Sequence, residues 1–408
     1  MSKMISKILL ALSLLFSTKI SFADATTDLW TALKTANYTN ALTAIAAGAD
    51  VKNLDATFGT PLNLASCWAD ADVVKALIDA KSEINFVSPS NGYTPLMNAA
   101  SWGNIEAVKL LLAAGGDVHI KTKLGQPILA LAITSCKLEI IKLLVDAGAN
   151  PLDKYSLGTI NNLTMMDALI GSKEPEEKIA SYTGTATALS KLGVTLPASL
   201  INAKPTDYSS LEEIAIYFLD KGCDPNEPSG GWGTIMMQAL DFGKTGVAKA
   251  LIEHGVTAEF DMKKGFKVKD KRGDNAKLPN FTFKNGDFVL VAVLLNNLDF
   301  IKLMVDKYPE LVKKSYEGSG TMKCIGAATD YNATGINLLM VAAEKGNIDI
   351  VKYLISKGAG RGDAVEIKQF KQDKFCPIFS VMFTMGFARA SNNQEVIDAV
   401  KAAGFGKE

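Results

Sequence analysis

Few side chains in this sequence have the types and spacing that catalysis or metal binding needs. The 408 residues include two histidines, His119 and His254, and five cysteines whose spacing matches no zinc pattern. No HExxH, GxSxG or GxxxxGKS motif is present, and residues 318–323 (GSGTMK) lack the spacing of a phosphate loop. We therefore expect no enzyme, no cofactor and no metal site; a carboxylate site without a motif is the remote alternative.

The elements that would position any functional residue come from an internal repeat. Residues 60–85 read TPLNLASCWADADVVKALIDAKSEIN, and residues 94–119 read TPLMNAASWGNIEAVKLLLAAGGDVH, 34 residues later. A weaker copy follows at 125–151, a strong one at 335–359 and a fair one at 234–255. A fixed period of this size indicates a solenoid, whose units stack and bury one another's apolar faces.

This repeat resembles the ankyrin-repeat family. The register G-x-T-P-L…A-A…G…V…L-L…G-x-D-V is carried by Gly92, Thr94, Pro95, Leu96, Ala99, Ala100, Gly103, Val108, Leu111, Leu112, Gly115, Asp117 and Val118. Degenerate copies include residues 179–194, interpreted as the second helix and glycine stop of another unit. The resemblance implies an all-α solenoid of about ten helix-turn-helix units with β-turn or hairpin fingers, over residues 24–408.

One family feature is missing. The usual histidine of TPLH is replaced by Asn63, Met97, Ala130, Met237 and Met340. The hydrogen bonds that this histidine normally makes between repeats are therefore in doubt, and methionine at this position suggests packing in place of a polar contact.

The resemblance also implies a binding surface, because the first-helix ends and the turns before Thr-Pro face the concave side in this family. Trp68 and Trp102 occupy equivalent positions 34 residues apart, so they should be neighbours. Tryptophan and tyrosine are common interface anchors. The alternative is that both tryptophans fill the core. The predicted partner-binding residues are Trp68, Tyr93, Ser101, Trp102, Trp232, Asp241, Phe242 and Leu295.

Three segments interrupt the period, at 171–207, 260–287 and 317–331. The first could hold the closing half of one unit and the opening half of the next. The second predicts an extended loop or β-hairpin and is basic, through Lys263, Lys264, Lys267, Lys269, Lys271 and Arg272. This basic loop is either a solvated loop or an arm that binds an acidic partner. Nucleic-acid binding is not expected, because the loop has few aromatic residues.

The first 23 residues read as a secretory signal peptide. Lys3 and Lys7 precede an apolar run at 8–16, and small residues stand at the expected cleavage site, after Ala23 or Ala25. The run is short for a membrane span, and we expect none after cleavage. We therefore expect a periplasmic or secreted protein of bacterial type. In such a compartment Cys324 and Cys376 could form a disulfide between adjacent units.

Taken together, the sequence predicts an exported, monomeric ankyrin-repeat protein that binds an unknown protein partner through its concave surface and inhibits or protects that partner. The alternative is a secreted effector or adhesin that acts on host proteins.

Overall fold

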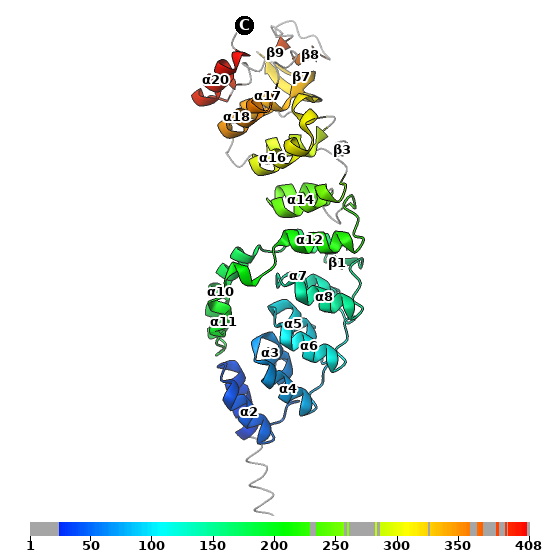
Figure 1. Cartoon of the computed structure of the whole chain (residues 1–408), viewed down its shortest axis with the longest axis vertical. Helices are drawn as coiled ribbons and strands as arrows, with labels where there is room; N and C mark the ends of the chain where they lie inside the picture. Colours follow the sequence, from blue (N-terminus) through cyan, green and yellow to red (C-terminus); the bar gives the residue numbers. More distant parts are fainter. Residues whose placement is uncertain are drawn as a thin grey trace, which may run out of the picture. The chain divides into compact units, whose positions relative to one another are not determined.

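The chain divides into two compact units, residues 1–233 and 234–408, and each contains stacked helix pairs (Figure 1). Each unit is described by itself. The computed structural model describes residues 24–228, 234–256, 259–260, 282–283, 286–324, 327–359, 365–369, 381–382, 388–389 and 391–405.

The N-terminal unit is built from pairs of short helices. Residues 24–34 are helical and precede α2 (Tyr38–Ala46); the pairs that follow are α3 (Pro61–Trp68) with α4 (Ala71–Asp79), α5 (Pro95–Trp102) with α6 (Ile105–Ala113), α7 (Ile128–Ile133) with α8 (Leu138–Asp146), and α9 (Met165–Ile170) with α12 (Leu211–Asp220). The first helices α3, α5, α7 and α9 stack on one another, as do the second helices α2, α4, α6 and α8. The predicted helical repeat solenoid is confirmed.

The repeat motif sets where the first helices begin. The hydroxyls of Thr60, Thr94 and Thr164 accept hydrogen bonds from the third backbone N–H of α3, α5 and α9. Pro61 and Pro95 follow two of these threonines at the first helical position, where a missing N–H has no cost. The second helices are amphipathic and bury one face; in α6 that face is Ala107, Val108 and Leu111.

Asparagine side chains connect neighbouring repeats. Asn63 Nδ2 donates to the Tyr93 carbonyl at 3.2 Å, and Asn98 Nδ2 donates to the Asn63 carbonyl at 3.1 Å. Asn104 Nδ2 donates to the carbonyl of Ala69 at 3.0 Å. Met97, by contrast, is fully buried at the position equivalent to Asn63. Packing therefore replaces the family's histidine at Met97, as the sequence suggests, whereas Asn63 keeps a polar contact between repeats.

Gly92 lets two successive fingers approach each other. Its φ is +77°, and a Cβ there would lie 2.5 Å from the backbone nitrogen of Lys123 in the next finger. Both the left-handed conformation and the contact exclude a larger residue.

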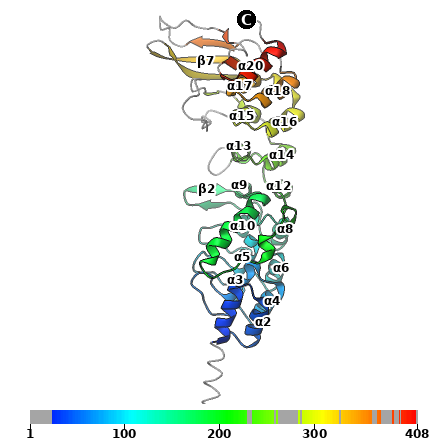
Figure 2. The ribbon, with the colours of Figure 1, turned by 90° about the vertical axis from the view of Figure 1, so that its left-hand side faces the viewer.

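The segment between α9 and α12 is one insertion within a single repeat. It contains α10 (Pro175–Ser190), α11 (Ala198–Ile201) and the 3₁₀ turn η1 (Pro205–Asp207). We call residues 175–207 the strap. The prediction that residues 179–194 supply the second helix of a repeat is wrong, because α12 fills that place against α9. Both views show α10 and α11 beside the first helices (Figures 1 and 2).

The C-terminal unit repeats the helix pairs and adds a sheet. Its helices are α13 (Ile235–Asp241), α14 (Thr245–Glu253), α15 (Phe288–Leu294), α16 (Leu298–Lys307), η3 (Pro309–Lys313), α17 (Leu338–Lys345), α18 (Ile348–Ser356), α20 (Gln394–Val400) and the π-helical turn η4 (Lys401–Phe405). Thr234, Asp287 and Asn337 cap α13, α15 and α17 as threonines cap the N-terminal helices. The same local rule therefore governs both units.

The strands lie at the fingers, between the second helix of one repeat and the first helix of the next. β1 (Tyr155–Leu157) and β2 (Ile160–Leu163) form a hairpin in the N-terminal unit. In the C-terminal unit, β3 (Glu259–Phe260) pairs with β5 (Gly286–Asp287), and a five-stranded antiparallel sheet runs in the order β4 (Thr282–Phe283), β6 (Ser315–Cys324), β7 (Ala327–Asn337), β8 (Val365–Gln369), β9 (Val381–Met382). The predicted insertion at 317–331 is thus a long hairpin.

A buried tyrosine joins this sheet to the helices. The Tyr316 hydroxyl donates to Asp287 Oδ2 at 2.8 Å, and Asp287 Oδ1 accepts the N–H of Leu290 at the start of α15 at 2.9 Å. Asp287 and Tyr316 are fully buried, and Lys314 Nζ lies 3.4 Å from the carboxylate. Burial and the adjacent carboxylate raise the pKa of Tyr316, so the phenol stays protonated and keeps donating.

Several predicted features lie outside the described residues: Trp232, the basic loop from Lys263 to Arg272, Cys376 and the side chain of Cys324. Over the part of the chain that the structure describes, no helix has the length and apolar character of a membrane span.

Candidate partner-binding face

Two of the predicted binding residues meet at the ends of neighbouring first helices. Trp68 ends α3 and Trp102 ends α5, and their rings contact edge to face with centroids 4.6 Å apart. Both side chains are half-buried. The prediction that the two tryptophans are neighbours is confirmed. We call the surface formed by α3, α5 and α7 on the side of these tryptophans the inner-helix face.

A third aromatic ring from the strap joins the pair. Tyr182 of α10 stacks on Trp102 with ring centroids 6.4 Å apart and an interplanar angle of 13°. An aromatic pair of this kind contributes about 0.5–1.5 kcal/mol beyond its buried area. The chain's own helix therefore already occupies part of the surface that the sequence assigns to a partner.

The strap is attached to the connection between α7 and α8 near both of its ends. Cys136 Sγ donates to the Lys173 carbonyl at 3.3 Å, and Lys178 Nζ donates to the carbonyl of Thr134. After the strap, the backbone N–H of Ser209 donates to the Cys136 carbonyl at 2.8 Å, and Ser209 Oγ accepts the N–H of Leu138 at 3.2 Å. These contacts fix the position of the chain directly before α12, the second helix of the repeat.

The far end of the strap reaches the first helix of the unit. The N–H of Thr195 donates to the Lys34 carbonyl at 2.8 Å. Val194 and Leu196, on either side, are buried. The strap therefore extends from the α7–α8 connection to residues 24–34, along the inner-helix face.

Lys178 is held in an environment that disfavours its charge. Burial lowers the pKa of Lys178 to about 8, and the nearby cations Lys173 and Lys137 lower it further. Its Nζ also lies 5.8 Å from the centre of the Tyr182 ring. Lys137 itself has a lowered pKa because of burial, and its Nζ lies 4.2 Å from the centre of the Tyr208 ring. Three lysines, Lys137, Lys173 and Lys178, therefore lie close together between the strap and the α7–α8 connection.

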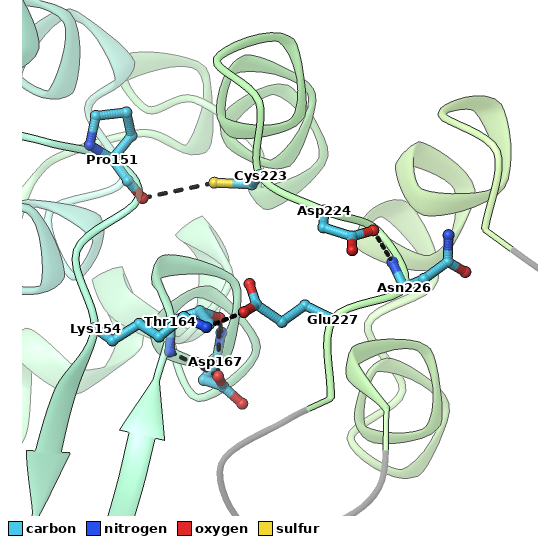
Figure 3. A network of polar contacts seen from close by, with 8 residues as sticks. All are labelled: Pro151, Lys154, Thr164, Asp167, Cys223, Asp224, Asn226 and Glu227. Atoms are coloured by element: carbon cyan, nitrogen blue, oxygen red, sulfur yellow. Dashed lines mark hydrogen bonds and ion pairs between the residues drawn. The ribbon is translucent and has the colours of Figure 1, made fainter.

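Figure 3 shows how α12 closes its repeat against the preceding one despite the insertion. Cys223 Sγ donates to the Pro151 carbonyl at 3.6 Å, and Lys154 forms an ion pair with Glu227. These partners are 72 and 73 residues apart in the chain. The polar contacts in the figure are therefore structural, because each is explained by turn, cap or repeat packing.

The other predicted binding residues lie in less crowded surroundings. Tyr93 is half-buried, and its carbonyl accepts the Asn63 bond; Ser101 Oγ lies 3.4 Å from Thr134 Oγ1. In the C-terminal unit, Asp241 is exposed, Phe242 is 61% exposed and Leu295 is half-buried. These three residues belong to the C-terminal unit, whereas Trp68 and Trp102 belong to the N-terminal unit.

The described residues hold no group of three or more His, Cys, Asp or Glu side chains placed to bind a metal ion. Cys67, Cys136 and Cys223 are buried thiols, and burial raises the pKa of the Cys223 thiol to about 11. A thiol that stays protonated is a poor nucleophile. What the arrangement does offer is apolar and aromatic surface for binding.

Comparison with known families agrees with the helix pairs. Ankyrin-repeat profiles match residues 29–122 and 62–155 with a three-copy model, and residues 334–365 with a single repeat. The chain is an ankyrin-repeat protein. No curated protein matches it. Ankyrin repeats generally mediate protein–protein interaction and are typically non-catalytic scaffolds.

Sequence reasoning missed the residues of the strap that reach the inner-helix face: Lys178, Tyr182 and Thr195. A signal was present. Between the glycine stops Gly148 and Gly222 only one first-helix start occurs, at Thr164, although 74 residues separate the stops. One start in that interval indicates one repeat with a long insertion.

Proposed function

We propose that this protein is exported and binds another protein through the inner-helix face of its N-terminal unit. The observation that carries the proposal is the contact between Trp68 and Trp102, which places two half-exposed aromatic rings on successive first helices. Large aromatic residues on a rigid scaffold are the side chains that contribute most to interface affinity. Export is supported by the basic and apolar pattern of residues 1–23.

Within this proposal the binding inhibits or protects the partner, because a rigid repeat surface acts by covering part of another protein. The test is affinity capture from the exported fraction with the full-length chain as bait. A chain with Trp68→Ala and Trp102→Ala serves as the matched variant, and thermal unfolding checks that it folds. We expect at least one protein to be captured by the native chain and lost with the variant. Equal capture by both chains would assign binding to another surface.

A secreted effector or adhesin is the second candidate. Fractionation separates the two: retention in the periplasm supports the inhibitor or protective role, and release into the medium supports the effector.

A further inference from the structure

We propose that α10 occupies the site on the inner-helix face where a helix of the partner protein binds. The partner's helix displaces the strap and places an aromatic side chain against Trp102. This inference rests on the proposed function and names the class of partner: a helical segment with one aromatic residue flanked by small residues. The strap is then the occupant that the partner must displace.

The first reason is that the inner-helix face accepts a helix in this structure. Tyr182 stacks on Trp102, and small half-buried residues lie near it on α10: Ser181, Thr185 and Ala186. Small side chains let a helix lie close to the surface while one ring makes the contact. The position of α10 therefore shows how a helix of the partner would lie on this face.

The second reason is that α10 is attached weakly. Of its sixteen residues, only Pro175 and Tyr182 are buried. A second helix of the repeats such as α4 buries three of nine residues, Val73, Val74 and Leu77. Because hydrophobic stabilisation scales with the apolar area removed from water, α10 contributes little to folding and costs little to displace.

The third reason is that the strap fits its place imperfectly. The Tyr182 hydroxyl is buried, and within the described residues no partner meets it in good hydrogen-bond geometry; its polar neighbour is the Tyr208 hydroxyl. A buried hydroxyl without a well-placed partner destabilises the attached state of the strap. Lys178, four residues earlier, is desolvated beside Lys137 and Lys173. A partner helix that carries phenylalanine and no lysine at these positions avoids both costs.

The remaining contacts place the strap where it can be exchanged without unfolding the repeats. Its attachments at Thr195 and Ser209 are backbone hydrogen bonds to the carbonyls of Lys34 and Cys136, and Val194 and Leu196 are buried beside the first of them. The α9–α12 pair that flanks the strap is closed independently by the Cys223–Pro151 and Lys154–Glu227 contacts. Release of α10 therefore leaves the solenoid intact.

The experiment uses full-length chains and a fluorescent synthetic peptide with the sequence of residues 173–197. Binding is measured by fluorescence anisotropy to the native chain, to Tyr182→Ala, and to Trp102→Ala with Tyr182→Ala. Tyr217→Ala is the matched control, because Tyr217 is an aromatic residue of α12 that packs beside Phe218 and lysines.

We expect the Tyr182→Ala chain to bind the peptide at least tenfold more tightly than the native chain or Tyr217→Ala, in which the tethered strap competes. The double variant should not bind. A peptide with Tyr182→Phe should bind roughly fivefold more tightly than the native peptide, because it buries no unpaired hydroxyl. Equal affinity of native and Tyr182→Ala chains, or unchanged binding by the double variant, overturns the proposal.

A second measurement covers the case in which Tyr182→Ala folds poorly. Excess Tyr182→Phe peptide is added to the native chain, and hydrogen exchange is followed by mass spectrometry. Faster exchange in residues 175–190 with unchanged α5 supports displacement, and unchanged exchange in both counts against it. Failure of these peptide tests while the native chain still captures a partner refutes this inference and leaves the proposed function standing.

Discussion

The two units of this protein build the same helix pairs but insert extra chain at different points of the repeat. In the N-terminal unit the insertion separates the first helix α9 from the second helix α12, and it folds along the inner-helix face. In the C-terminal unit the insertions follow second helices, and they form a sheet at the fingers. The position of an insertion within the repeat therefore decides which surface it remodels.

The two insertions also differ in how they are fixed. The sheet is joined to α15 by Tyr316, which is fully buried and hydrogen-bonded to Asp287. The strap is joined to α5 by Tyr182, which is buried and, in the described structure, has no partner in good hydrogen-bond geometry. One tyrosine stabilises its insertion, and the other makes its insertion exchangeable.

The largest difference between the two insertions is expected when the hydroxyl of each tyrosine is removed. Tyr316→Phe should lower the free energy of unfolding by about 1–3 kcal/mol, because Asp287 loses a buried donor. Tyr182→Phe should not destabilise the protein and should slow hydrogen exchange in α10. Chemical denaturation and exchange mass spectrometry measure both. If the two variants lose equal stability, the strap is as firmly built as the sheet.

The lysine charge beneath the strap predicts that attachment of the strap depends on pH. With the strap in place, the pKa of Lys178 is about 8, below the ordinary lysine value, so attachment of the strap expels a proton. Protonation therefore favours release below pH 8, and the strap is held more tightly as pH rises from about 8 toward the ordinary lysine value. The groups that face Lys178 are Cys136, Lys137, Lys173 and Tyr182.

Lys178→Met should remove this dependence. The ratio of α10 exchange rates in the native chain and the variant cancels the intrinsic effect of pH on exchange. We expect several-fold faster exchange in the native chain at pH 7 and a ratio near one at pH 10.5. A ratio that does not change with pH would mean that Lys178 carries no penalty.

A smaller effect is expected at Cys136, which has a φ of +54° where Gly103 stands in the preceding repeat. A side chain in this conformation costs about 1 kcal/mol or more, and here its thiol donates to Lys173. Cys136→Gly should change the free energy of unfolding by less than about 1 kcal/mol but speed exchange in α10. Asn296→Gly, at φ +63° in the C-terminal unit, is the control and should leave α10 unchanged.

The smallest effect is expected at Phe242, which is 61% exposed at the end of α13. Phe242→Ala should change the free energy of unfolding by no more than about 0.5 kcal/mol, because little apolar area is lost. Thermal unfolding checks this, and partner capture with the same variant shows whether the C-terminal unit contributes to binding. A large loss of stability would show that Phe242 belongs to the fold.

The sequence by itself determined the repeats, their helix starts and the meeting of Trp68 with Trp102. These features are local or recur at a fixed period: a threonine or asparagine cap, a left-handed glycine and an apolar stripe act within one turn or one unit. The sequence also indicated that Met97 packs where the family has histidine.

Only the tertiary structure decided where the irregular segments go. Residues 179–194 have the composition and glycine stop of a second helix, and α10 is indeed helical. Whether that helix joins the stack or lies on it depends on competition with α12, which buries five side chains against the solenoid, whereas α10 buries two. The larger apolar area takes the place in the stack, and the weaker helix is left to cover the face that a partner would use.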